Sequence, residues 1–147
     1  MNRFALLVLL LALSFGISAC GQGGTSATPT GVPSAEGQAS LLAALRDAGA
    51  AVEVVDSIDQ VFFSPQGSLL SVNEADVQVF EYESAEAMEA EAAQVAPDGG
   101  SIGTSMVTWV DTPHFYKSGR IIVLYVGSDE AILDLLEIVL GPQFAGR

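Results

Sequence analysis

The chain has 147 residues, half of them hydrophobic, a formal net charge of −13 at pH 7 and a pI of about 4.1. A surface this acidic repels nucleic acid and anionic lipid head groups, so we expect no nucleic-acid partner. Cys20 is the single cysteine, which excludes an intramolecular disulfide, and the length suits one domain with a modest core.

The first twenty residues have the layout of a secretory signal. A short basic segment, Met1–Arg3, precedes an apolar run over 4–15 that is shorter than the ~20 residues needed to span a bilayer. This leader resembles those of bacterial lipoproteins, whose lipobox places an aliphatic and two small residues before a cysteine, here Ile17-Ser18-Ala19-Cys20. The resemblance implies diacylation of the Cys20 thiol and cleavage before it. The alternative is an ordinary signal peptide with Cys20 as a free thiol.

The resemblance divides the chain into three parts. Residues 1–19 are expected to be the signal peptide, 20–38 the lipidated cysteine with a disordered tether, and 39–147 a single domain. The tether is rich in Gly, Ser, Thr, Pro and Ala, with Glu36 as its one charge, and such a composition buries too little apolar area to fold. The lipid on Cys20 would hold the protein at the cell membrane or outer membrane, facing the periplasm or the exterior.

The remaining sequence predicts an α+β fold. Ser40, Ser84 and Ser128 are expected to cap helices that end near Ala48, Val95 and Leu140. Alternating and β-branched residues predict strands at 51–55, 61–63, 68–72, 77–82, 105–110, 114–116 and 120–126. The order α-β-β-β-β-α-β-β-β-α favours a mostly antiparallel sheet with two or three helices packed on it. Two helices on one face would leave the other face for water, a partner or a ligand.

The C-terminal third carries the clearest patterns. Residues 121–126 have no polar face, which predicts a central strand covered on both sides, joined to 114–116 by a hairpin turn at 117–119. In the last helix only Glu130, Asp134 and Glu137 are polar, so its remaining residues are expected to be deeply packed. Residues 77–95 also align without gaps onto 121–139, either through duplication or because strand–cap–helix units look alike.

Two patterns offer catalytic chemistry. Gly99-Gly100-Ser101-Ile102-Gly103 matches the G-x-S-x-G of α/β-hydrolases, but here a helix precedes the loop and a strand follows it, the reverse of the order that motif requires. Asp111 and His114 could form an acid–base pair or half a metal site, yet further nitrogen or sulfur ligands are lacking. A linker serine and a hydrogen-bonded histidine are the simpler interpretations. We therefore expect no catalytic residues, no metal and no cofactor.

Carboxylates gather in the turns of the first half of the domain. A weak calcium site could be built from them, but no D-x-[DN]-x-[DN]-G loop is present, so solvated turn carboxylates are the better interpretation. The residues concerned are Asp56, Asp59, Glu74 and Asp76.

Basic and aromatic residues come together around the predicted hairpin. The candidate interaction patch consists of Trp109, His114, Tyr116, Lys117 and Arg120. Arginine and aromatic side chains are common in recognition surfaces, and this patch could contact an anionic group. The alternative is that Lys117 and Arg120 pair with nearby acidic residues and contribute little.

These observations predict a lipid-anchored, exported binding or interaction domain at the outer side of the cell envelope, with a protein or a small molecule as its partner. Two alternatives remain open. One is a small hydrolase that uses Ser101 or Asp111/His114, and the other is a structural component of the envelope.

Overall fold

The computed structural model describes residues 35–146, so the predicted signal peptide, Cys20 and the tether up to residue 34 lie outside the described residues. Its helices are α1 (Gln38–Asp47), α2 (Ala85–Ala92) and α3 (Glu130–Leu140). Its strands are β1 (Val52–Ile58), β2 (Gly67–Val72), β3 (Ala75–Glu81), β4 (Ser101–Ile102), β5 (Ser105–Met106), β6 (Pro113–Ser118), β7 (Ile121–Val126) and β8 (Ala145–Gly146). No helix in this part of the chain is long and apolar enough to cross a membrane.

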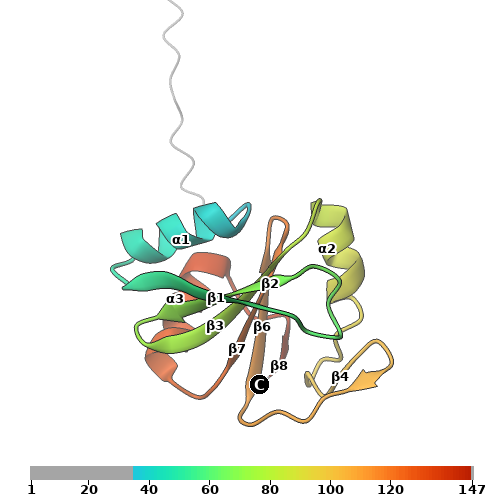
Figure 1. Cartoon of the computed structure of the whole chain (residues 1–147). Helices are drawn as coiled ribbons and strands as arrows, with labels where there is room; N and C mark the ends of the chain where they lie inside the picture. Colours follow the sequence, from blue (N-terminus) through green and yellow to red (C-terminus); the bar gives the residue numbers. More distant parts are fainter. Residues whose placement is uncertain (1–34, 147) are drawn as a thin grey trace, which may run out of the picture.

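The strands confirm the predicted α+β class. Six of them form one sheet in the order β1-β2-β3-β7-β6-β8, and every neighbouring pair is antiparallel. β4 and β5 form a separate two-stranded hairpin at one end of the molecule (Figure 1). The helices are packed on the large sheet, as the sequence predicted.

β7 is the central strand of the core. It lies between β3 and β6, and its side chains alternate between two hydrophobic clusters. Ile121, Val123 and Tyr125 point to the face covered by α1 and α3, whereas Ile122 and Leu124 point to the face covered by α2. All five are buried. Figure 1 shows α2 on the opposite side of the sheet from α1 and α3. The strand without a polar face is therefore covered on both sides, as predicted.

Aromatic side chains from loops complete the cover on the α2 face. The Trp109 ring packs edge-on against Phe62 and Phe115, with centroids 5.9 and 5.8 Å apart, and Phe63 lies 4.8 Å from Phe80. These rings and α2 occupy the face that two helices alone would have left open. The expectation of a free sheet face is therefore wrong.

The same loops account for two incorrect strand predictions. The predicted strand at 61–63 is a turn, and the predicted strand at 105–110 is reduced to β5. Phe63 is buried, and the Trp109 indole Nε1 donates to the carbonyl of Gly99 at 2.8 Å. Aromatic residues suit strands and core-facing loops alike, so their local pattern could not distinguish the two.

The helix starts follow local hydrogen bonding. Ser84 caps α2 as predicted, because its Oγ accepts a 3.1 Å hydrogen bond from a backbone N–H of the first turn. In α3 the cap is Asp129 rather than Ser128, with its carboxylate accepting from a backbone N–H at 2.9 Å. In α1 the N-cap is Gly37, and Ser40 lies inside the helix and reaches back to the Gly37 N–H at 2.9 Å.

The packed domain begins earlier than the predicted boundary at 38/39. Ala35 is 2% exposed, and the carbonyl of Glu36 accepts a 3.1 Å hydrogen bond from the backbone N–H of Arg120. Gly119 has φ +54° in the β6–β7 turn, and a Cβ added there would lie 2.5 Å from the Glu36 Cα. Residues 35–38, which composition assigned to the tether, are therefore fitted against this turn.

The buried face of α3 is narrower than predicted. Its core side chains are Ile132, Leu136, Val139 and Leu140. Leu133 and Leu135 are only partly buried, and Ile138 is 65% exposed. One side of α3 packs on the sheet. The other side faces solvent, although some of its residues are apolar.

Candidate functional site

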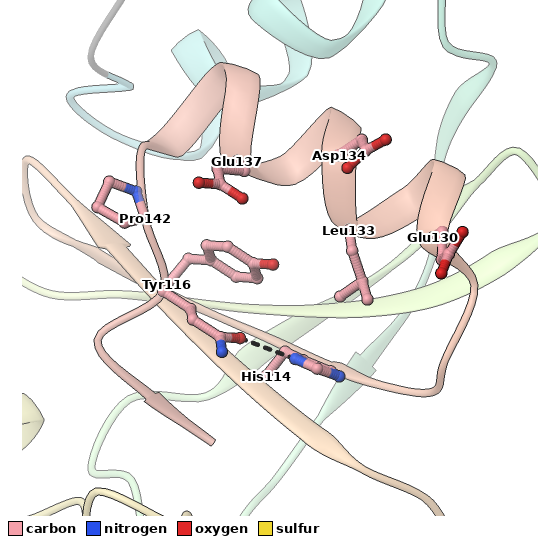
Figure 2. Close-up of a pocket in the computed structure, with 8 residues that line it drawn as sticks. His114, Tyr116, Glu130, Leu133, Asp134, Glu137 and Pro142 are labelled. Atoms are coloured by element: carbon pink, nitrogen blue, oxygen red, sulfur yellow. Dashed lines mark hydrogen bonds between the residues drawn. The ribbon is translucent and has the colours of Figure 1, made fainter. Parts of the chain in front are cut away.

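An open groove of about 550 Å³ lies between α3 and β6. Three segments line it: β6 supplies His114 and Tyr116, α3 supplies Glu130, Leu133, Asp134 and Glu137, and the chain after α3 supplies Pro142 and Gln143. Figure 2 shows the carboxylates along the helix on one side and the two ring side chains of β6 below them. Polar groups thus converge on a hollow with two apolar side chains in its walls.

The fold explains why these segments meet. Side chains of β6 alternate, so Phe115 joins the core beneath α2 while His114 and Tyr116 face α3. Gly141, with φ +85°, ends α3 and reverses the chain, a backbone conformation that glycine adopts readily. The following segment returns to β6, where β8 pairs with His114 and Phe115, and this return carries Gln143 to the groove.

His114 is held in one orientation by its neighbours. It is 6% exposed, its Nδ1 lies 2.8 Å from the Gln143 Oε1, and its ring stacks on Tyr125 at a centroid distance of 6.2 Å. An amide oxygen can only accept, so Nδ1 is the donor in this contact. The suggested pair of Asp111 and His114 is not formed. Asp111 is exposed, and its carboxylate accepts from the Thr112 N–H at 2.7 Å.

Tyr116 presents an unpartnered hydroxyl to the groove. The residue is 3% exposed, and its hydroxyl has no hydrogen bond to any described residue. No side-chain nitrogen or oxygen in this part of the chain is both fully buried and unpaired, so the hydroxyl must open into the groove. Figure 2 shows the ring beneath α3 with its hydroxyl directed toward Leu133.

The charges around Tyr116 keep this hydroxyl protonated. Burial, and then the negative charges of Glu137 and Asp134, raise its pKa from 10.0 to about 12. Both effects disfavour the phenolate, the first by desolvation and the second by repulsion. At neutral pH the groove therefore contains a neutral hydroxyl, able to donate or accept, beneath a row of carboxylates.

The predicted interaction patch is divided between the two faces of the sheet. His114 and Tyr116 line the groove on the α3 face, whereas Trp109 and Lys117 belong to the α2 face. Arg120 lies in the turn between β6 and β7. Of the five residues, the structure brings only His114 and Tyr116 together at one site.

The basic residues of the patch have acidic partners. Lys117 pairs with Glu89 of α2, and an Arg120 guanidinium nitrogen lies 2.6 Å from the Glu81 Oε1. This is the alternative that the sequence left open for the two residues. Both pairs are roughly half exposed, so each contributes little to stability.

The other sequence motifs do not form sites among residues 35–146. Ser101 lies in the short β4–β5 hairpin, and no described residue is hydrogen-bonded to its hydroxyl. No three His, Cys, Asp or Glu side chains in this range converge closely enough to hold a metal ion, and this includes the turn carboxylates considered for calcium.

Sequence reasoning missed part of the site. Glu130, Asp134 and Glu137 were recognised as the polar stripe of the last helix but not as a site, although their i, i+4, i+7 spacing is a readable signal. Gln143 had no signal, because only the chain reversal after α3 brings it to His114.

Comparison of the chain with protein-family models, curated proteins and solved structures finds no match. The functional class is therefore inferred from the residues of the groove. The groove is negatively charged, holds hydrogen-bonding groups that are not used by the fold, and has no Ser, Thr, Cys or Lys side chain among its lining residues.

Proposed function

We propose that this protein is a lipid-anchored, exported binding domain that holds a small ligand in the groove between α3 and β6. The anchor rests on the lipobox-like Ile17-Ser18-Ala19-Cys20, and the lipid would hold the domain at the outer side of the cell envelope. One observation carries the binding function: the Tyr116 hydroxyl is unpaired on a side chain that is 3% exposed. The hydroxyl opens into the groove, and ligand pockets typically place a few such free polar groups among apolar walls, so it is available to a ligand.

The groove supports binding better than the alternatives. A hydrolase needs a nucleophile beside a base, whereas Ser101 lies outside the groove and Nδ1 of His114 is engaged by Gln143. A purely structural component would gain nothing from an open groove with unpaired polar groups. We therefore favour recognition of a ligand without turnover.

The anchor is tested by Cys20→Ala in cells fed a tagged fatty acid. We expect the wild-type protein to carry the label, and the variant to carry none and to accumulate as a precursor or a released form. The acyl groups are attached through the thiol, which alanine lacks. Label that survives in the variant would refute the lipid anchor.

The groove is tested with Leu133→Arg, and Val61→Arg is the control. Both variants add the same side chain, but Leu133 lines the groove, whereas Val61 is exposed in the β1–β2 connection away from it. Small molecules extracted from the native cell envelope are passed over each immobilised protein, and retained compounds are identified by mass spectrometry. We expect a compound retained by the wild type and by Val61→Arg but not by Leu133→Arg, with cooperative melting of all three proteins. Identical retention by all three would contradict a ligand in this groove.

A further inference from the structure

The carboxylates of the groove form a row with regular spacing. Glu130, Asp134 and Glu137 are exposed along one side of α3, and a rise of 1.5 Å per residue separates them by about 6 Å and then about 4.5 Å along the helix axis. Like charges at i, i+4 destabilise a helix by about 0.2–0.5 kcal/mol. The row therefore carries a repulsion that a bound cation would relieve.

No described basic side chain supplies that cation. Arg46 donates to the Val52 carbonyl at 3.1 Å, while Lys117 and Arg120 form their ion pairs with acids outside α3. Within residues 35–146, the three carboxylates of the groove thus have no ion-pair partner. They also do not converge as ligands of a metal ion would. An elongated cation fits this arrangement better than a compact one.

The opposite wall suits the body of such a cation. Tyr116 offers a hydroxyl that can accept from an ammonium group and a ring face that attracts positive charge. His114 lines the same wall, with its Nδ1 engaged by Gln143. Leu133 and Pro142 give apolar contact for methylene groups. The unpaired hydroxyl is an observation independent of the acidic row, and both point to the same class of ligand.

We propose that the groove binds a linear aliphatic polyamine, with its ammonium groups along Glu130, Asp134 and Glu137 and its methylenes against Tyr116 and Leu133. This inference rests on the proposed function of the groove and names its ligand class. Bonds of about 1.5 Å at angles of about 111° advance an extended chain by about 1.25 Å each. Amines separated by four and by three carbons therefore lie about 6 and 5 Å apart, close to the spacing of the carboxylates.

Spermidine has this pattern of four and three carbons and is the probe. Full-length protein in a non-ionic detergent is titrated by isothermal calorimetry at low salt with spermidine, with magnesium, and with an uncharged polyether of the same length. We expect saturable binding of one spermidine per chain, weaker binding of magnesium, and none of the polyether. Absence of saturable spermidine binding would overturn the inference.

Two charge-matched triple variants separate site binding from general attraction. The groove variant is E130Q/D134N/E137Q, and the control is E53Q/E83Q/E86Q, which removes three exposed carboxylates elsewhere. Each set includes one glutamate from the first turn of a helix. We expect the groove variant to lose about tenfold or more in spermidine affinity. The control should change by less than about threefold. Equal losses in the two variants would show that only the overall negative charge attracts spermidine.

A pair of single-atom variants provides a second measurement. Tyr116→Phe removes the hydroxyl in the groove, and Tyr82→Phe removes one that is hydrogen-bonded to Glu91 at 2.8 Å on the other face. We expect only Tyr116→Phe to lower the affinity for spermidine, and unchanged affinity in that variant would contradict the proposed contact. If spermidine fails to bind while an envelope compound is still retained through Leu133, the ligand class is wrong and the groove function stands. If neither is observed, both fail.

Discussion

Substitution of Leu136 tests how tightly α3, which forms one wall of the groove, is packed on the sheet. The side chain is 0% exposed and belongs to the cluster that α1 and α3 form with the sheet. Ile138, two residues further along the same helix, is 65% exposed. Truncation of each to alanine removes the same number of carbon atoms from one helix, so the pair isolates the effect of burial.

The structure predicts a large difference between the two variants. Truncating Leu136 deletes three carbons, worth about 2.4 kcal/mol of transfer free energy, and the cavity left behind raises the cost to about 3–4 kcal/mol. Ile138→Ala should lose only about a third of that transfer free energy, because most of the side chain is already exposed. The better helix propensity of alanine offsets part of this loss, so we expect a destabilisation of about 0.5 kcal/mol. A domain of this size has about 5–15 kcal/mol of stability, so Leu136→Ala should still fold.

The free energy of unfolding is measured by urea titration, followed by circular dichroism. We expect both variants to keep the urea dependence of the wild type, with the midpoint strongly lowered only for Leu136→Ala. Leu136→Asp should have no cooperative transition, because an unpaired buried charge costs several kcal/mol. A loss below about 1 kcal/mol in Leu136→Ala, or equal losses in the two alanine variants, would refute the packing of α3 described here.

Two further predictions concern charge. The folded-state pKa of Tyr116, about 12, lies above the ordinary value of 10.0, so its contribution to stability is complete below pH 10 and is lost as the pH rises through 12. Between pH 9 and 11.5 the wild type should therefore lose about 2 kcal/mol that Tyr116→Phe retains, and parallel losses in urea titrations at the two pH values would be inconsistent with this. The double variant Lys117→Glu/Arg120→Glu should lose about 1–2 kcal/mol of unfolding free energy, because two half-exposed ion pairs become repulsive, and should keep the groove ligand. A variant that melts normally but no longer retains the ligand would instead restore the hairpin patch as the site.

Local patterns in the sequence were enough for the fold class and for its centre. The run at 121–126 has no polar position, so its apolar side chains are removed from water only when both faces of the strand are covered. Gly119 next to Ser118 marked the hairpin that joins it to β6. Ser84 was recognised as a cap because a hydroxyl before a helical pattern satisfies the free N–H groups of the first turn. Each of these signals depends on neighbours in the chain.

Features that depend on tertiary packing could not be predicted from the sequence. Hydropathy cannot tell Leu136 from Ile138, because both are apolar and only the docking of α3 decides which of them faces the sheet. The aromatic residues at 62, 63 and 109 were assigned to strands, although they fill the α2 face from loops. β8 is a strand only because it pairs with β6, and its two residues are too few to form a recognisable strand pattern in the sequence.

The groove was decided by tertiary structure alone. Its lining residues come from segments that meet only after β6 has joined the sheet, α3 has packed on it and the chain has reversed at Gly141. Sequence placed Tyr116 and His114 in a strand and the three carboxylates on a helix, but it could not show which polar group would be left without a partner. Whether a polar group finds a partner depends on all the atoms around it, and for Tyr116 these include Asp134 and Glu137, which are brought near only by the packing of α3.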